Sequence, residues 1–435
     1  MMQNKKVLQF KTEADFFDFA KEQFNHDSSF FMFDLSSLEH QHQRFTSFLP
    51  RVTPYYAIKC NPDPMLVKTL YSLGCGLDCA SKGELEEALD EVHADPDRII
   101  FANPCKLPEH IRFMKEIGVK RSTFDCEAEL IKMKELYPDS ELVLRLATND
   151  SKSRMPLSVV YGARREYWEP LVKKCQELGL NLIGVSFHIG SGSSEPSNFY
   201  DALKDAAEVF EIAERYGFSP YFLDIGGGFP GITEDKNSLC FEEFAGQVNI
   251  GLDEFFSSRK DLKIIAEPGR YFANGSMYSF LKVVSRKVFE GSTTPTFVES
   301  LVRKYGIINE DNNCKKEMYD YYVNESTNIF FTILLMEHNA FAYVHLLRDH
   351  KGEEKHRSNI YGFSSAENEL LVGEVMLPKL EVGEEIYFKN VGAYSNSVGV
   401  GTYRNGYTFN DKRFYFTISG SNIASETAST SSSMS

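Results

Sequence analysis

Three consecutive glycines, Gly226, Gly227 and Gly228, directly follow the mainly apolar stretch 221–225. Because glycine has no Cβ, the backbone can bend sharply here and expose successive N–H groups. A row of bare N–H groups forms a concave site that suits an anion, above all a phosphate. A tight strand-to-helix turn without any ligand produces the same pattern, so the motif needs support from residues elsewhere in the chain.

Side chains capable of acid–base or covalent chemistry stand at the ends of other apolar stretches. Lys59, His188 and Glu267 each occupy such a place. A desolvated lysine loses its proton more easily and can form a Schiff base with an aldehyde. The structural alternatives are a lysine that reaches solvent, a histidine satisfied within the core, and a surface ion pair between Glu267 and Arg270.

Further polar residues stand at comparable places: Asp78, with Glu84 just beyond it, Arg145 and Ser191. Guanidinium and hydroxyl groups are suitable donors to a phosphate. Asp78 and Ser81 would instead cap a helix in the simplest structural interpretation. Each residue alone has an ordinary explanation, so the position of all of them relative to the fold decides between the alternatives.

The elements that must position these side chains alternate between short strands and helices from residue 37 to residue 275. The predicted strands are residues 55–59, 76–80, 98–103, 122–125, 142–148, 182–190, 221–226 and 263–267. Eight β/α units of this length are typical of a closed (β/α)8 TIM-type barrel, although a doubly wound open sheet has the same periodicity. In a barrel, the carboxyl ends of all strands meet at one mouth, where the polar residues would converge.

A lysine, a histidine, an acid, an arginine and a glycine nest at one barrel mouth together suit pyridoxal 5′-phosphate. Lys59 would hold the aldehyde, and the three glycines with Ser191 and Arg270 would bind the phosphate. Glu267 would keep the ring nitrogen protonated so that the ring accepts electrons. His188 would stack on the face of the ring.

The remainder of the chain predicts a second domain. Residues 1–36 contain an apolar strand and form an N-terminal segment that we expect to join a β domain at residues 276–420. Strands of this antiparallel domain are predicted at residues 321–323, 330–335, 384–389 and 413–419. Residues 421–435 are rich in serine and threonine, which predicts a disordered tail.

Composition excludes several classes of function. The 435-residue chain carries a formal net charge of −15, which disfavours binding to nucleic acid or to anionic membranes. Its eight cysteines show no pairing that suggests a metal site or a disulfide framework. The first residues lead into no apolar segment, so we expect no signal peptide and a cytoplasmic location.

Several motifs resemble the eukaryotic ornithine decarboxylase family from about residue 28 to about residue 420. They are residues 56–61 (Tyr-Ala-Ile-Lys-Cys-Asn), 78–82, 187–192, 223–231 and 266–271. The resemblance implies an alanine-racemase-like barrel with a β domain, pyridoxal phosphate, and a head-to-tail homodimer with active sites at its interface. The family's cofactor positions correspond to Lys59, Asp78, Glu84, Arg145, His188, Ser191, Gly226, Gly227, Gly228, Glu267, Arg270 and Tyr394. Gly392 matches a glycine of the family's dimer interface.

The chain departs from the family where the substrate is expected. The family's Trp-Gly-Pro-Xaa-Cys-Asp motif, contributed by the mate subunit, aligns with residues 361–366. Ser365 therefore replaces the cysteine that protonates the product carbon, and Ala366 replaces an aspartate that binds the distal amine of ornithine. The other substitutions affect a Tyr-Asp pair, a pocket tyrosine and a lysine that pairs across the dimer, which align with Met336 and Glu337, with Asn328 and with Val160.

These departures change the expected substrate. Without the buried aspartate, a distal ammonium group would lack its counter-charge, whereas Ala366 and Met336 favour an apolar side chain. A serine hydroxyl is a weaker acid than a thiol, so reprotonation at Ser365 should differ. The sequence predicts a decarboxylase for a neutral aliphatic amino acid such as leucine, which releases CO2 and a primary amine. The alternative is a non-catalytic, antizyme-binding regulator of polyamine metabolism, but the retained Lys59 and Glu267 favour the enzyme.

Overall fold

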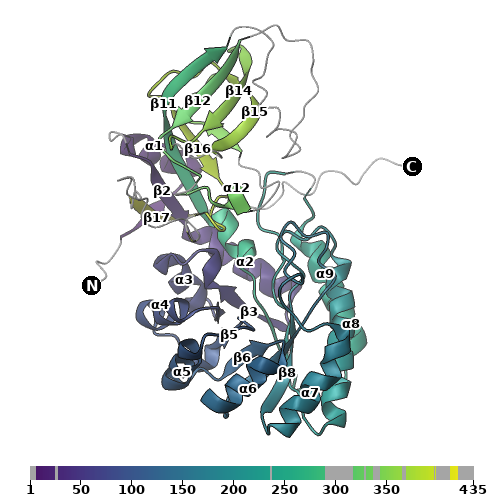
Figure 1. Cartoon of the computed structure of the whole chain (residues 1–435). Coiled ribbons are helices and arrows are strands. Elements are labelled where there is room, and N and C mark those ends of the chain that lie inside the picture. Colours follow the sequence, from purple (N-terminus) through teal and green to yellow (C-terminus); the bar gives the residue numbers. More distant parts are fainter. Residues whose placement is uncertain are drawn as a thin grey trace.

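The computed structural model describes most of the chain and consists of a barrel and a β-sheet domain (Figure 1). The described residues are 6–24, 28–235, 238–289, 317–327, 330–336, 343–364, 369–395, 397 and 412–419. The predicted tail at residues 421–435 lies outside them. Among the described helices, none combines the length and the apolar character needed to cross a membrane.

Eight parallel strands form the barrel. They are β3 (Val52–Ala57), β4 (Gly76–Cys79), β5 (Ile99–Phe101), β6 (Arg121–Phe124), β7 (Glu141–Leu146), β8 (Asn181–Phe187), β9 (Phe222–Asp224) and β10 (Lys263–Ala266). Each strand pairs with the next, and β10 pairs with β3, so the barrel is closed. The predicted (β/α)8 barrel is therefore confirmed, and the doubly wound alternative is wrong. A cluster of six buried apolar side chains packs together from six of these strands: Tyr55, Ile100, Val143, Ile183, Phe222 and Ile265.

Helices form the outer layer around these strands (Figure 1). They are α2 (Leu35–Phe48), α3 (Pro64–Ser72), α4 (Lys82–Val92), α5 (Pro108–Ile117), α6 (Glu127–Leu136), α7 (Trp168–Glu177), α8 (Ser197–Arg215), α9 (Phe241–Phe256) and α10 (Arg270–Ala273). Short 3₁₀ turns are η1 (Ile58–Cys60), η2 (Pro96–Arg98), η3 (Arg165–Tyr167) and η4 (Asn274–Ser276). Helix α8 buries Phe199, Leu203, Ala206 and Phe210, which repeat at helical spacing and face the barrel.

The second domain is built on strands from both ends of the chain. Its elements are β1 (Val7–Phe10), α1 (Glu13–Gln23), β2 (Phe30–Asp34), β11 (Met277–Phe289), β12 (Met318–Val323), α12 (Ile333–Met336), β13 (Val344–Leu346), β14 (Lys355–Tyr361), β15 (Leu370–Pro378), β16 (Glu385–Lys389) and β17 (Arg413–Ile418). The strand order is β1-β17-β2-β11-β12-β14-β15, and β16 pairs with β11 and β13. The predicted participation of the N-terminal strand is confirmed. Three pairs within this largely antiparallel domain, β1–β17, β17–β2 and β12–β14, are parallel.

Two local predictions were wrong. Residues 330–335 were expected to form a strand, but they form a turn followed by α12. Their aromatic residues are nevertheless buried, and the ring of Phe330 stacks on that of Phe31 with a centroid distance of 4.3 Å. Lys59 was expected at the end of a strand, but β3 ends at Ala57 and Lys59 lies in the 3₁₀ turn η1.

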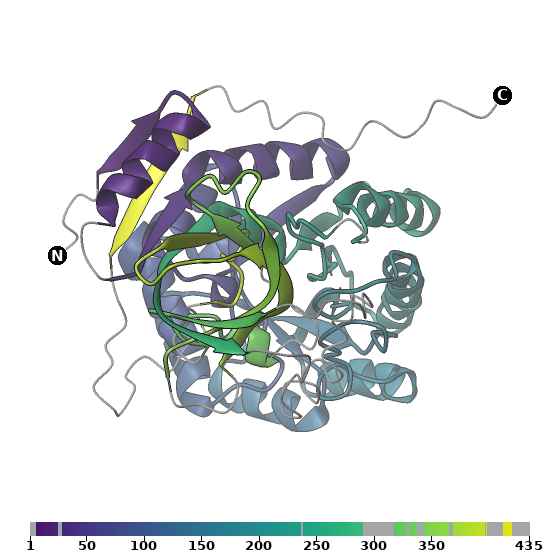
Figure 2. The ribbon, with the colours of Figure 1, turned by 90° about the horizontal axis from the view of Figure 1, so that it is seen from above.

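The β domain lies over one end of the barrel, as the view from above shows (Figure 2). Strand β11 leads directly from the barrel into it, and residues 391–395 return to the barrel. The side-chain amide of Asn61 donates to the Gly392 carbonyl at 2.8 Å, and the Tyr394 N–H donates to the Cys60 carbonyl at 2.9 Å. A Cβ at Gly392 would lie 1.9 Å from the Ala273 carbonyl oxygen, so glycine is required by contacts within one chain.

Candidate active site

An ion pair between Lys59 and Asp78 lies just beyond the carboxyl ends of β3 and β4. The Lys59 Nζ lies 2.5 Å from Oδ2 of Asp78; the lysine side chain keeps 40% of its surface exposed, whereas the aspartate side chain is fully buried. Burial lowers the pKa of Lys59, but the attraction of Asp78, followed by that of Glu267, outweighs it and raises the pKa above its ordinary value. The lysine is therefore held as a cation at the mouth of the barrel, and the expectation that desolvation would ease the loss of its proton is wrong, because the neighbouring carboxylates outweigh burial.

Two buried carboxyl groups, Asp224 and Glu267, stand at the ends of the adjacent strands β9 and β10. The Glu267 N–H donates to the Gly226 carbonyl at 2.7 Å, and Glu267 is only 8% exposed. Burial raises the pKa of Glu267 well above its usual range, and repulsion from Asp224 and Asp78 adds to the effect. Burial also raises the pKa of Asp224 to about 6. Because ionising both buried carboxyl groups side by side is unfavourable, the protonated form of Glu267 is favoured.

His188 follows β8 and is neutral. Burial, followed by the positive charges of Arg145 and Lys59, lowers its pKa well below the ordinary value. The Gly190 N–H donates to Nδ1 of His188 at 2.9 Å. Since Nδ1 accepts this bond, the proton of the neutral ring is on Nε2. A Cβ at Gly227 would lie 2.8 Å from that Nε2, so the imidazole lies directly against the glycine bend.

The glycine bend lies between β9 and its neighbouring strands. Gly226 and Gly228 have φ values of +62° and +108°, which favour glycine. A Cβ at Gly226 would lie 2.0 Å from the Phe187 carbonyl oxygen, and one at Gly227 would lie 2.8 Å from the Glu267 carbonyl oxygen. The three glycines therefore allow a close approach of backbones at the barrel mouth.

Ser191 and Arg270 are in contact close to this bend. Arg270 begins α10, and its Nη2 donates to Ser191 Oγ at 3.1 Å. The Arg270 guanidinium also lies 5.3 Å from the centre of the Tyr394 ring. Because Arg270 pairs with Ser191 and Glu267 is buried, the predicted alternative of a surface pair between Glu267 and Arg270 is wrong.

Glu84 and Arg145 lie near the same centre. The Ser81 Oγ accepts from the Glu84 N–H at 3.2 Å, and the Glu84 carboxylate accepts from the Ala80 N–H at 2.7 Å. Helix capping therefore explains Ser81 but not Asp78, which pairs with Lys59. Burial raises the pKa of Glu84, while the charge of Lys59 opposes the shift. Arg145 lies on β7, and its charge acts on His188.

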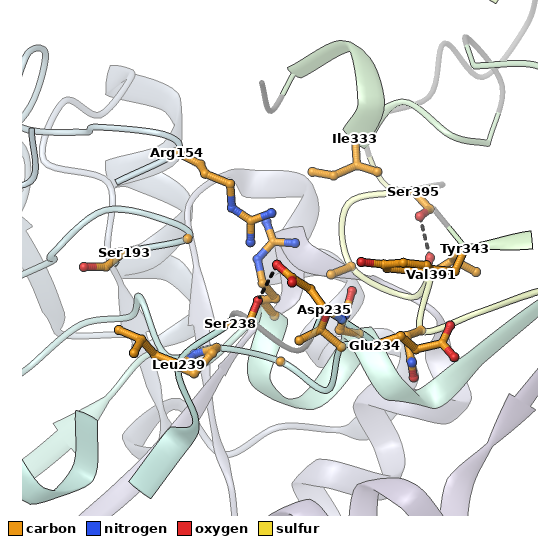
Figure 3. Close-up of a pocket in the computed structure, with 18 of the residues that line it drawn as sticks. Arg154, Ser193, Glu234, Asp235, Ser238, Leu239, Ile333, Tyr343, Val391 and Ser395 are labelled. Carbon is orange, nitrogen blue, oxygen red and sulfur yellow. Dashed lines mark hydrogen bonds between the residues drawn. The ribbon is translucent and has the colours of Figure 1, made fainter. Parts of the chain in front are cut away.

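A cavity of about 490 Å³ lies beside this cluster, between barrel loops and the β domain (Figure 3). Gly192, Gly228 and Arg270 form part of its wall on the barrel side. Ile333, Tyr343 and other residues of the β domain form the opposite wall. The cavity therefore adjoins the contact between Arg270 and Ser191.

The predicted cofactor residues are brought together, whereas the predicted substrate residues are not described. Asn328, Glu337, Ser365 and Ala366 lie outside the described residues, and Met336 is the last residue of α12. Asp224 was missed as a site residue, although it ends an apolar strand in the same way as the residues that were selected. Its proximity to Glu267 depends on the pairing of β9 with β10, which the sequence does not specify.

Comparisons with known proteins identify both parts of the chain. Residues 35–274 match the pyridoxal-binding domain of pyridoxal-dependent decarboxylases, and residues 266–392 match the C-terminal sheet domain of such enzymes. Antizyme inhibitor 2 of Xenopus laevis and ornithine decarboxylase of Rattus norvegicus are each 38% identical over 367 residues. These matches cover 84% of this chain and 77% and 76% of the two relatives, respectively.

Solved structures show the same architecture. The arginine decarboxylase of Paramecium bursaria Chlorella virus superposes with a TM-score of 0.81 at 30% identity, covering 92% of this chain and 99% of that one. The lysine decarboxylase of Selenomonas ruminantium gives a TM-score of 0.76 at 25% identity, covering 94% and 96%. The barrel-mouth residues, the two matched domains and these relatives agree, and the chain belongs to the pyridoxal-dependent decarboxylase family that includes the ornithine, arginine and lysine decarboxylases.

Proposed function

We propose that the protein binds pyridoxal 5′-phosphate and decarboxylates a neutral aliphatic L-amino acid, such as leucine, rather than ornithine. The observation that carries the cofactor part of the proposal is the arrangement of Lys59, Asp78 and Glu267 around one barrel mouth, next to the glycine bend. The observation that carries the substrate part is the replacement of the family's aspartate and cysteine by Ala366 and Ser365.

The residues present fit the cofactor. Buried oxygens of Asp78 (Oδ1) and Asp224 (Oδ2) have no hydrogen-bond partner within the described part of the chain. Such acceptors, together with the amine of Lys59 and a proton-retaining Glu267, suit a polar aromatic aldehyde. The bend at Gly226–228 and the contact between Ser191 and Arg270 suit a phosphate ester.

Pyridoxal phosphate would supply an aldehyde that joins an amine and a ring that withdraws electrons from the substrate's Cα. Lys59 would hold the aldehyde until the substrate amine replaces it, and Asp78 would position the Lys59 amine. Glu267 would face the ring nitrogen and share with it the proton that burial favours at this carboxyl group. The neutral His188 would lie against the ring without adding charge.

The reaction needs one bond broken and one formed at Cα. The bond from Cα to the carboxylate breaks, CO2 leaves, and a proton adds to Cα. In the family pattern a cysteine gives this proton, so Ser365 would stand in its place. Because a hydroxyl group holds its proton more tightly than a thiol does, we expect slower or solvent-assisted protonation.

A homodimer is part of this proposal, because in the family pattern residues 361–366 come from the mate subunit. Val159 and Val160 are 80% and 73% exposed, which supports a surface that a second copy covers. In the family, a lysine at the place of Val160 pairs across the dimer. Its loss leaves apolar contact, rather than an ion pair, at that point of the proposed interface.

A panel of amino acids tests the function. The purified protein with pyridoxal phosphate should release CO2 and the matching amine from leucine-like acids and not from ornithine. Ala366→Asp should reduce turnover of leucine, because a carboxylate would enter an apolar pocket. Failure to release CO2 from any of the twenty amino acids, with the cofactor bound, would overturn the proposal.

A second function has support from one comparison, the 38% identity to the antizyme inhibitor of Xenopus laevis. Under this alternative, the chain acts by binding antizyme and has no use for the cofactor. The two functions are separated by spectroscopy and binding. A visible absorbance band of bound pyridoxal phosphate that disappears in Lys59→Ala supports the enzyme, whereas tight antizyme binding without such a band supports the regulator.

A further inference from the structure

We propose that Arg154 is a second arginine for the phosphate group of the cofactor, acting together with Arg270. The inference rests on the proposed function and adds a residue that the sequence patterns did not select. Arg154 belongs to the segment between β7 and η3, which passes over the barrel mouth, and it is exposed at the edge of the cavity.

Backbone hydrogen bonds fix the Arg154 segment to the loop that contains Ser191. Met155 and Ser191 exchange N–H···O bonds of 3.0 and 3.2 Å, and the Arg154 N–H donates to the Gly192 carbonyl at 3.2 Å. The Ser153 hydroxyl donates to the Ile189 carbonyl at 2.7 Å. Arg154 is therefore held beside Ser191 by main-chain pairing.

The guanidinium of Arg154 lies on Gly192. A Cβ at Gly192, whose φ is +66°, would lie 2.4 Å from the Arg154 Nε, so the Arg154 side chain packs directly on this glycine. The preceding residue, Ser191, accepts a hydrogen bond from Arg270. Both arginines, with Gly228, line the same cavity, and Figure 3 shows Arg154 extending into it. Two guanidinium groups therefore face the cavity from neighbouring positions.

The charge of the cavity wall favours an anion. Its basic residues are Lys152, Arg154, Arg270 and Lys389, two more than its acidic residues Glu234 and Asp235, and Lys152 also pairs with Glu195 outside the wall. Glu234 is already engaged by Lys389 at 3.0 Å and by His345 at 2.9 Å. This positive surface occurs in a chain whose net charge is −15. A phosphate monoester carries almost two negative charges near neutral pH and would balance the excess.

Equilibrium titration of the cofactor-free full-length protein with pyridoxal phosphate and with pyridoxal, which lacks the phosphate, tests the role of Arg154. Arg154→Met should lower the affinity for pyridoxal phosphate by about tenfold or more, since a charge-assisted hydrogen bond is lost. Its affinity for pyridoxal should stay at the wild-type value. Arg154→Lys should recover part of the affinity. The matched control is Arg164→Met, an exposed arginine that does not line the cavity and should change neither affinity.

The outcomes separate this inference from the proposed function. If wild type binds pyridoxal phosphate and Arg154→Met binds it within about twofold of wild type, the role of Arg154 is overturned and the proposed function stands. If Arg154→Met binds both ligands more weakly by the same factor and has a lower melting temperature than wild type, Arg154 has a structural role, and the inference is also overturned. If wild type binds neither ligand, the proposed function fails, and this inference fails with it.

Discussion

Burial decides the protonation states of the groups around Lys59. In water, a glutamic acid is ionised at neutral pH, but desolvation and the nearby Asp224 raise the pKa of Glu267 and favour its protonated form. Burial and nearby positive charges lower the pKa of His188, so its ring stays neutral. The sequence indicated which residue types stand at the strand ends. It could not indicate these charge states, because they depend on distances between separate strands.

Substituting Gly227 by alanine, which adds a single carbon atom, tests the role of the glycine bend. Gly227→Ala would place a Cβ 2.8 Å from both the Glu267 carbonyl oxygen and His188 Nε2. We expect a loss of about 1–3 kcal/mol in the free energy of unfolding, as for other overpacked sites. We also expect pyridoxal phosphate to bind about tenfold more weakly or worse, measured by spectroscopic titration.

The control for this substitution is Gly246→Ala in α9, where no other group lies within 4 Å of the added Cβ. Alanine is the better helix former, so this variant should be more stable than wild type by about 1 kcal/mol. Its cofactor affinity should not change. Unchanged cofactor binding in Gly227→Ala would contradict the placement of the cofactor at the bend.

Glu325 predicts a pH dependence of stability. Burial, opposed by hydrogen bonds from Ser29 and Ser326 and reinforced by nearby Glu369, raises its pKa from 4.5 to about 7. The folded state therefore holds a proton that the unfolded state releases between about pH 4.5 and 7, and stability falls as the pH rises through this range. The whole effect corresponds to about 3 kcal/mol.

Glu325→Gln removes this titration while keeping the size of the side chain. The free energy of unfolding, measured with urea, should be compared for the variant and wild type at pH 5 and pH 8. The variant should gain stability relative to wild type at the higher pH. A difference between the two proteins that is the same at both pH values would show that Glu325 ionises normally in the fold.

At the scale of elements, Glu369 joins two segments of the β domain. Its carboxylate accepts from the Ser326 hydroxyl at 2.6 Å, from the Thr327 N–H at 3.1 Å, and from the Ser364 hydroxyl. Thr327 and Ser364 directly precede Asn328 and Ser365 in the sequence, which are two of the predicted substrate residues. Glu369 therefore connects the stretches on which the substrate part of the proposal depends.

Glu369→Ala should lower the free energy of unfolding by about 3 kcal/mol, because buried donors lose a charged acceptor. Glu369→Gln should lower it less, since one oxygen acceptor is kept. Glu381→Ala provides the control, because Glu381 is 62% exposed and solvent screens its pair with Arg286, so its removal should change stability much less. Equal losses in the Glu369→Ala and Glu381→Ala variants would contradict the proposed connection.

The barrel was predictable because its short apolar strands alternate with helices whose apolar residues repeat at clear helical spacing. The strand predicted at residues 330–335 failed for a physical reason: a short apolar run has no periodicity that separates a buried helix from a strand. Phe330 and Phe331 are buried as expected, but in a turn and not in a ladder. The parallel pairing of β12 with β14 could not be predicted from the sequence either, because it depends on long-range contacts.

For the whole molecule, the proposed cofactor site joins both domains, since Tyr394 from the β domain lies beside Arg270 from the barrel. Pyridoxal phosphate should therefore raise the melting temperature of the cofactor-free protein. At a concentration of about 100 times its Kd, the stabilisation should be about 2.7 kcal/mol. Lys59→Ala should show a smaller shift in melting temperature at the same cofactor concentration. A wild-type melting temperature that does not change with added cofactor would contradict a site between the domains.

The convergence of the proposed cofactor residues was predictable, because the strands of a barrel bring their ends to one mouth whatever their separation along the chain. Asp224 and Arg154 were missed for different reasons. Asp224 stands within the motif that drew attention, but its partner is on another strand. Arg154 lies in a loop without any periodic pattern, and only main-chain pairing with Ser191 reveals its place.

The attachment of the turn η1 to residues 392 and 394 has a consequence for how molecules reach the centre. Cys60 and Asn61 directly follow Lys59, and both are hydrogen-bonded to the β domain. A hinge motion that separated the two domains would therefore move the Lys59 amine away from Asp78. We therefore expect substrate to enter and product to leave through movements of surface loops, while the two domains keep a fixed orientation relative to each other.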